Sequence, residues 1–171
     1  MEDLAIMAGT TYTGIQIWDD IKSVDFLCSM PEVDPGRIGC MGLSMGGFRS
    51  VFLAALDDRI KCSCSVGYMT RMEDIIPHRS PSISFTLPGL FGHLPFYDLA
   101  SLAAPRHMLV LNCENDKLFE LSSMEQAAEN IAKVYRKAGA GNNFKSRGFP
   151  VGHQFDLEMQ EYAFEWLDKN L

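Results

Sequence analysis

The sequence predicts an α/β protein with three layers (α/β/α), in which helices cover both faces of a mostly parallel sheet. Short apolar stretches alternate along the chain with segments of helical periodicity, and this alternation is typical of parallel sheets. The two clearest strand candidates are apolar almost throughout, as strands buried on both faces are. Because 171 residues suffice for one compact domain and are few for two, we expect a single domain over residues 1–171.

The order of the elements follows from periodicity and from turn residues. A helix is expected from Ile17, because Ile17, Ile21, Val24 and Cys28 recur at helical spacing, and Pro31 ends it. The first dozen residues are ambiguous. Residues 70–98, rich in Pro, Gly and aromatic residues, fit neither period and are expected to form a short lid insertion over the site. The other expected elements are strands at 37–41, 62–69, 107–113 and 144–149 and helices after Ser44 and at 99–104, 124–138 and 156–171.

Composition argues against several classes of function. The net charge is −7, and the sequence contains no cluster of basic residues. Both features argue against binding to a nucleic acid or to an anionic membrane surface. No apolar run is long enough to cross a bilayer, and no secretory leader is recognisable at the start. The five cysteines are an odd number without the spacing of a disulfide framework. We therefore expect a cytoplasmic protein.

The strongest local signal is a glycine-rich turn between an expected strand and an expected helix. It reads Gly42-Leu43-Ser44-Met45-Gly46-Gly47. A tight strand-to-helix turn lifts a serine hydroxyl clear of the sheet, and glycines two residues before and after it avoid collisions within the turn. The turn therefore predicts that Ser44 is a nucleophile, and that the N–H of Met45 at the helix N-terminus stabilises a negative oxygen.

Serine needs a base to take its proton, and four histidines are available. His107 opens an apolar strand, while His78 and His93 lie in the irregular stretch. His153 lies in a loop between the last strand and the last helix, at the sheet edge that should also carry Ser44. His153 is therefore the predicted base.

A carboxylate should orient that base. The loop after the strand 107–113 offers Glu114 and Asp116, and Asp156 follows His153. We favour Asp116, with Glu114 as the alternative and Asp156 third. The chain order serine, aspartate, histidine is the one found in α/β-hydrolases.

With these residues in place, the sequence resembles the α/β-hydrolase superfamily, and within it the dienelactone-hydrolase and acetyl-xylan-esterase-like branch. The likeness extends from about Gly14 onward, and a serine rather than a cysteine nucleophile favours the esterase side. It rests on Trp18-Asp19-Asp20, residues 33–39, the Ser44 turn, the Asp116 loop and Gly152-His153-Gln154-Phe155. The resemblance implies hydrolysis of a small-molecule ester through an acyl-enzyme on Ser44, with no metal and no organic cofactor.

The resemblance also implies a difference at the N-terminus. Such enzymes begin with further strands and a loop that carries a second oxyanion donor, so this chain corresponds to the C-terminal part of their fold. Loss of one donor typically lowers the rate by about 100- to 1000-fold, which predicts weak activity. The strand at 37–41 becomes an apolar edge, and an apolar edge tends to pair. Its cover is expected to be the first residues, a missing upstream segment, or a second copy in a homodimer.

The residues of the predicted substrate pocket come from the stretch after the second strand. Met69, Ile75, Phe85 and Phe91 would line it, although the same side chains could pack into a small core of their own. Two other functions stay open at this point. One is a serine peptidase like prolyl oligopeptidase, and the other is an inactive or weakly active truncated hydrolase that acts through a partner chain.

Overall fold

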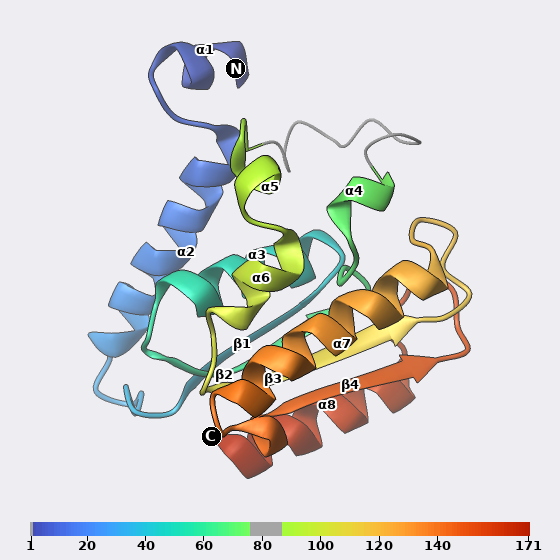
Figure 1. The fold of residues 1–171 in the computed structure, drawn as a ribbon. Coiled ribbons are helices and arrows are strands. Elements are labelled where there is room, and N and C mark those ends of the chain that lie inside the picture. The colour runs from blue at the N-terminus through green and yellow to red at the C-terminus, as the bar shows by residue number, and fades with distance from the viewer. Residues whose placement is uncertain (1, 76–86) are drawn as a thin grey trace.

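A computed structural model describes residues 2–75 and 87–171 of the protein. Its centre is a four-stranded sheet in which every pair of neighbouring strands is parallel (Figure 1). The strands lie in the same order in space as in the sequence: β1 (Ile38–Leu43), β2 (Ile60–Val66), β3 (His107–Cys113) and β4 (Phe144–Phe149). Because all four strands run the same way, their carboxyl ends meet at one edge of the sheet.

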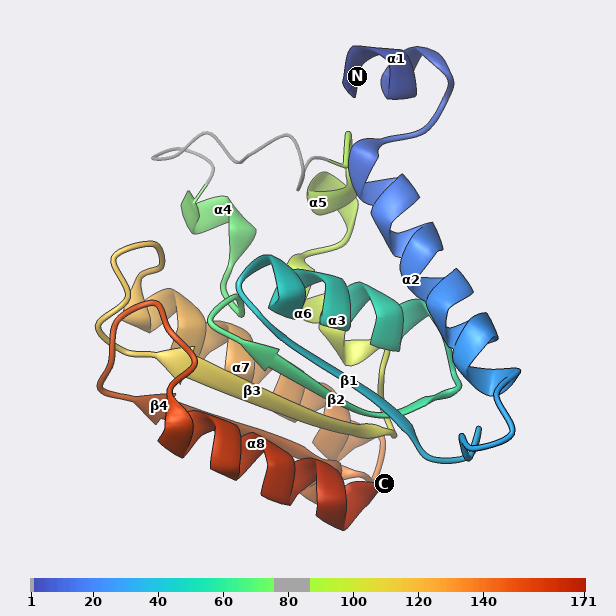
Figure 2. The ribbon, with the colours of Figure 1, turned by 180° about the vertical axis from the view of Figure 1, so that it is seen from behind.

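Helices cover both faces of this sheet and complete the predicted three layers. Figures 1 and 2 show the α8 helix (Leu157–Asn170) on one face and the α7 helix (Leu121–Lys137) on the other, with α3 (Met45–Leu56) and α6 (Phe96–Ser101) beside α7. The α2 helix (Tyr12–Cys28) packs on the outside of α3. The remaining short elements are α1 (Glu2–Met7), α4 (Met72–Ile75), α5 (Leu90–His93) and a 3₁₀ turn, η2 (Gly141–Asn143).

Several boundaries differ from the sequence prediction, and local hydrogen bonding explains one of them. β2 spans Ile60–Val66 instead of 62–69, and α7 begins at Leu121 instead of Met124. The α2 helix begins at Tyr12 instead of Ile17, because the Thr11 hydroxyl accepts a hydrogen bond from the Gly14 N–H at 2.9 Å and caps the first turn. The residues left unassigned at the start form α1. The strands 107–113 and 144–149 agree with the prediction residue for residue.

The core is divided by the sheet. On the α7 side, Phe48, Phe52, Tyr68 and Phe96 form a group of aromatic rings, and Phe48 stacks on Phe96 with centroids 5.4 Å apart. On the other side, Met159 and Ala163 of α8 pack against β2 and β3. Cys62, Cys64 and Cys113 are fully buried, so they fill space as small apolar side chains.

β1 and β4 are the edges of the sheet. The outer edge of β1 pairs with no strand among the described residues. The first of the three expected covers, residues 2–16, contributes α1 and the start of α2 and no strand. β4 carries Lys145 and Arg147, and charged side chains of this kind protect an edge from unwanted pairing. Among the described residues, none of the helices has the length and apolar character needed to cross a bilayer.

Candidate active site

Ser44 occupies the turn that joins β1 to α3. It is the only residue other than glycine in the described chain with a positive φ, and its backbone angles are φ 57° and ψ −117°. Its N–H donates to the Val66 carbonyl at 2.8 Å, which ties the turn to the end of β2. A non-glycine residue held in such a conformation stores strain and is a recognised mark of a functional position.

The glycines around Ser44 have different roles. A Cβ added at Gly42 would lie 2.6 Å from the Cα of Gly46, so only glycine fits at position 42. A Cβ at Gly47 would lie 2.9 Å from the Val66 carbonyl oxygen, which confirms close packing of α3 on β2. A Cβ at Gly46 would meet nothing within 4 Å, so the expected collision arises from Gly42 alone.

His153 and Asp116 are in direct contact. Nδ1 of His153 lies 2.6 Å from Oδ2 of Asp116, and the Asp116 side chain is fully buried while that of His153 is 26% exposed. The second oxygen of Asp116, Oδ1, accepts a hydrogen bond from the Leu118 N–H at 2.8 Å. The carboxylate is therefore held by its own loop and in turn orients the imidazole, with Nε2 directed away from Asp116.

The imidazole of His153 lies at the same sheet edge as Ser44. A Cβ added at Gly67 would be 3.5 Å from both Nδ1 and Cε1 of His153, and 3.3 Å from Cδ1 of Leu43. Gly67 follows β2, and its φ of +60° favours glycine. Ser44 is hydrogen-bonded to Val66, and His153 lies against Gly67. The predicted nucleophile and the predicted base are therefore both positioned by the end of β2, through two residues that are adjacent in the chain.

Sequence reasoning overlooked Gly67 and Phe119. The Phe119 ring lies 6.3 Å from the imidazole of His153, and Phe119 also contacts Tyr68 of the core. The available signal was a glycine within the expected strand 62–69, because a glycine in a strand often marks the close approach of another part of the chain. Nothing in the sequence marked Phe119.

The two competing carboxylates are directed elsewhere. The Glu114 side chain lies across Gly148, where an added Cβ would collide with its carboxylate. Asp156 caps α8, with Oδ1 accepting a hydrogen bond from the Met159 N–H at 3.0 Å. Of the three candidates, Asp116 alone contacts His153.

Met45 begins α3, directly after Ser44. In the first turn of a helix the backbone N–H groups have no acceptor within the helix, so the Met45 N–H can donate to a ligand. The Gln16 amide of α2 reaches the Met45 sulfur at 3.9 Å, and the Arg49 guanidinium binds Asp20 with Nε to Oδ2 at 2.9 Å. These contacts hold α2 against the first turns of α3.

The predicted substrate-binding residues are only partly described. Met69 is fully buried and belongs to the core cluster on the α7 side of the sheet, so the prediction that it lines an accessible pocket is corrected. Ile75 lies in α4 and Phe91 lies in α5. Phe85 lies outside the described residues.

The buried thiols are not equipped for nucleophilic chemistry. Burial raises the pKa of Cys40 to about 12 and that of Cys62 to about 11, so both stay protonated near neutral pH. In the described part of the chain, no group of three or more His, Cys, Asp or Glu side chains is arranged to hold a metal ion.

Comparison with solved structures places this geometry in a known architecture. A family 15 carbohydrate esterase, the glucuronoyl esterase of Caldicellulosiruptor kristjansonii, superposes with a TM-score of 0.76 at 15% identity over 93% of this chain and 50% of that one. The catalytic domain of a glucuronoyl esterase from Hypocrea jecorina gives a TM-score of 0.71 at 15% identity, over 93% of this chain and 51% of that one.

The chain has the α/β-hydrolase fold. Sequence similarity points the same way: residues 10–80 of this chain match the acetyl xylan esterase (AXE1) family. Over 169 residues it is 27% identical to YtaP of Bacillus subtilis (strain 168), whose name describes it as a hydrolase; the match covers 96% of this chain and 56% of YtaP. The chain thus spans about half the length of the relatives it matches. Their names agree with the predicted reaction class, carboxylic ester hydrolysis.

Proposed function

We propose that this chain is a serine hydrolase that cleaves carboxylic esters through an acyl-enzyme on Ser44. The observation that carries the proposal is the 2.6 Å contact between His153 and the buried Asp116, formed beside the strained turn of Ser44. A serine on a tight turn, an imidazole and an orienting carboxylate are the three parts that acyl transfer requires.

In the proposed reaction, Oγ of Ser44 attacks the ester carbonyl carbon while its proton passes to Nε2 of His153. The imidazolium then gives that proton to the departing alcohol as the carbon–oxygen bond breaks. Water repeats the sequence on the acyl-enzyme and releases the carboxylic acid. Asp116 fixes the tautomer of the neutral imidazole and stabilises the imidazolium that forms, and the Met45 N–H donates to the oxygen that becomes negative.

The proposed substrates are small or medium acyl esters, including acetylated sugars. The match of residues 10–80 to the acetyl xylan esterase family supports this class. The proposal includes a reducing compartment, the cytoplasm, because buried cysteines such as Cys62 and Cys64 serve as apolar core groups and carry no disulfide.

A fluorophosphonate probe tests the nucleophile. We expect intact wild-type protein to gain the mass of one adduct and the Ser44→Ala variant to gain none. Equal labelling of the two proteins would remove the proposed role of Ser44. An unlabelled wild type that is folded by circular dichroism would instead favour the inactive hydrolase that works through a partner chain.

Two chromogenic substrates then separate the remaining reactions. Wild-type protein should hydrolyse p-nitrophenyl acetate in a Ser44-dependent manner and leave a prolyl peptide amide intact. Turnover of the amide at a comparable rate would replace the esterase by a peptidase of the prolyl-oligopeptidase kind. If the amide and not the ester were cleaved, the result of fluorophosphonate labelling would still hold. The identity of the nucleophile and the class of substrate are therefore tested separately.

A further inference from the structure

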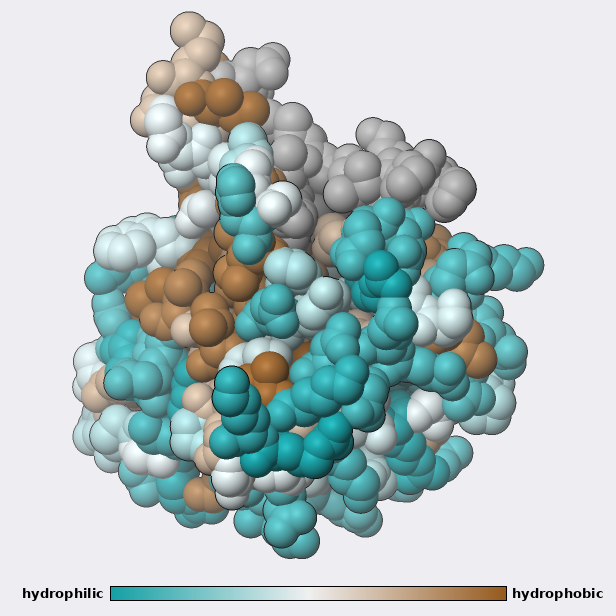
Figure 3. Space-filling view, in the orientation of Figure 1, coloured by the Kyte–Doolittle hydropathy of each residue, from teal (hydrophilic) through white to brown (hydrophobic). Residues whose placement is uncertain are grey.

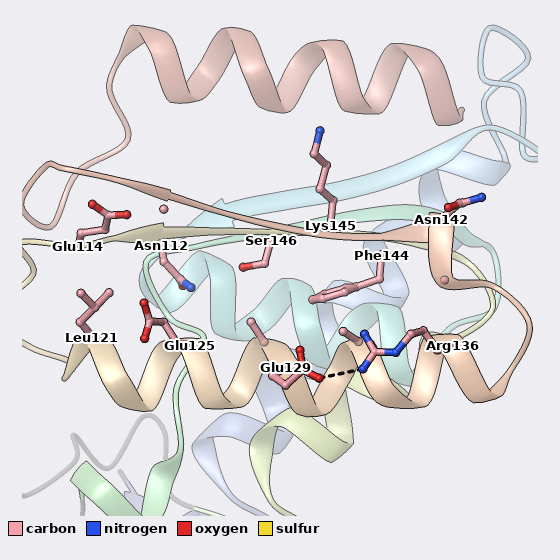
Figure 4. A pocket seen from close by; sticks show the side chains of 14 residues that line it. Asn112, Glu114, Leu121, Glu125, Glu129, Arg136, Asn142, Phe144, Lys145 and Ser146 are labelled. Carbon is pink, nitrogen blue, oxygen red and sulfur yellow. Dashed lines mark hydrogen bonds and ion pairs between the residues drawn. The ribbon is translucent and has the colours of Figure 1, made fainter.

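A groove of about 620 Å³ lies away from Ser44, between α7 and the strands β3 and β4 (Figure 4). The α7 helix forms one wall with Glu125, Glu129 and Arg136. The opposite side is formed by Asn112 of β3 and Ser146 of β4. In Figure 3 the outer surface over α7 is mainly hydrophilic, whereas apolar atoms gather between α2 and α6. The groove itself combines these polar side chains with apolar ones, namely Leu121, Ala128, Ala132 and Phe144.

Asn112 is an anomaly within this groove. Its side chain points from β3 toward α7, and the residue is only 5% exposed (Figure 4). Nevertheless its Oδ1 accepts no hydrogen bond from any residue in the ranges 2–75 and 87–171. A buried amide oxygen without a partner is costly, and such atoms are rare in proteins unless a ligand or water satisfies them. In Figure 4 the amide nitrogen of Asn112 lies on the side of α7, so a half-turn of the amide about the Cβ–Cγ bond would bring the oxygen to face the groove.

The charges near Asn112 are negative and largely uncompensated. Glu114 and Glu125 both line the groove, and neither forms an ion pair with a cation of the described chain. Glu129 is neutralised by Arg136, with Oε1 to Nη2 at 2.8 Å. Lys145 extends toward α8 in Figure 4, where its Nζ lies 5.0 Å from the Tyr162 ring centroid. The end of the groove near Asn112 is therefore acidic.

Gly148 belongs to the same arrangement. Its missing side chain lets the Glu114 carboxylate lie across β4 at the end of the groove, since an added Cβ would occupy the same space. Glu114 follows β3 directly and lies only two residues from Asp116, yet it turns away from His153. The Glu114 carboxylate is thus part of the groove and not of the proposed catalytic site.

We propose that the groove binds a primary alkylammonium group. Such a group carries one positive charge and three N–H donors, which match the carboxylates of Glu114 and Glu125 and the unpartnered oxygen of Asn112. The neighbouring Ser146 hydroxyl offers a further acceptor. The group can belong to a free polyamine or to the lysine side chain of a peptide, and this inference does not depend on the proposed esterase activity.

Titration by nuclear magnetic resonance tests the site, with putrescine and N-acetyl-lysinamide as separate probes at constant ionic strength. We expect saturable shifts of the amide signals of residues 112, 114, 125 and 146. Glu125→Gln should weaken binding about tenfold, as expected for loss of one charge-assisted hydrogen bond. Tighter binding of putrescine would indicate a free polyamine, and tighter binding of the lysine derivative a peptide side chain; either supports the site.

Glu161→Gln is the matched control, because it removes the same charge from an exposed residue of α8, on the opposite face of the sheet. It should bind both probes like wild type. Because Glu125 is exposed, its substitution leaves the core intact. Equal weakening by the two substitutions, or the absence of saturable shifts in the groove, would overturn the proposal.

Discussion

Nδ1 of His153 lies 2.6 Å from Oδ2 of Asp116, although 37 residues separate them in the sequence. Backbone hydrogen bonds between the two loops hold this pair together. The Asn115 N–H donates to the Val151 carbonyl at 3.0 Å, and the Glu114 N–H donates to the Phe149 carbonyl at 2.8 Å. The parallel pairing of β3 with β4 thus continues into the loops that carry the two side chains.

This contact predicts a large effect of Asp116→Asn on activity. An asparagine cannot fix the same tautomer or stabilise the imidazolium, so kcat should fall by about 1,000- to 10,000-fold with little change in the fold. Steady-state hydrolysis of p-nitrophenyl acetate and circular dichroism measure the two effects. Glu114→Gln is the control and should retain near-wild-type kcat; the reverse ranking would transfer the orienting role to Glu114.

The strained backbone of Ser44 predicts that substitutions which remove the nucleophile can make the protein more stable. Glycine adopts a φ of 57° with little strain, so Ser44→Gly should raise the free energy of unfolding by about 1 kcal/mol. Ser44→Ala keeps the Cβ and should gain less. Urea denaturation compares the two variants, both of which lack the nucleophile. If the alanine variant were as stable as the glycine variant, backbone strain would not be the cause.

The two glycines of the turn should differ in their response to a methyl group. Gly42→Ala forces the new Cβ against Gly46 and should destabilise the protein by about 1–3 kcal/mol, the usual range for overpacking, with loss of fluorophosphonate labelling. Gly46→Ala places its Cβ in open space and should keep wild-type stability. Thermal unfolding followed by labelling tests both variants. A destabilised Gly46→Ala with an unaffected Gly42→Ala would contradict the turn geometry.

His107 predicts how stability responds to acid. Burial lowers its pKa below the ordinary value of about 6.5, and its Nδ1 has no partner among the described residues. Above that value the imidazole is neutral in both states and contributes nothing. As the pH falls below about 6.5, the unfolded state protonates first, so stability is lost.

His107→Gln should therefore flatten the loss of stability between about pH 6.5 and pH 5, relative to wild type. Urea midpoints at several pH values in this range provide the measurement. His93→Gln, outside the sheet, serves as the comparison. Parallel curves for wild type and His107→Gln would show that His107 does not titrate with folding.

The outer edge of β1, which pairs with no strand in the part of the chain that the structure describes, predicts self-association. Antiparallel pairing of two β1 strands would join two sheets in a homodimer, since unpaired N–H and C=O groups line this edge. Sedimentation velocity should show dimer as the concentration rises from about 1 to 100 μM, a range that suits a small interface of weak affinity. Hydrogen exchange at residues 38–43 should slow over the same range. A sedimentation coefficient that does not change with concentration would argue against pairing through β1.

Several parts of this fold were accessible from the sequence because local interactions specify them. The apolar run 107–113 formed a strand with the predicted limits, because a strand that is buried on both faces is a continuous apolar run whose ends are visible in the sequence. The glycines around Ser44 identified the turn because tight backbone approach leaves no room for a side chain at position 42. Helix limits were less accurate: the hydroxyl of Thr11, and not apolar periodicity, decides where α2 begins.

The sequence by itself determined the order of strands and helices, the strand-to-helix turn and the short list of acids and bases, because each of these is encoded within a few neighbouring residues. Only the tertiary structure decided which carboxylate meets His153, that Met69 belongs to the core, and that Glu114 and Asn112 share a second groove. The reason is physical: the direction of a loop side chain depends on the registers of the parallel strands that the loop joins, and those registers are set by contacts between residues far apart in the chain.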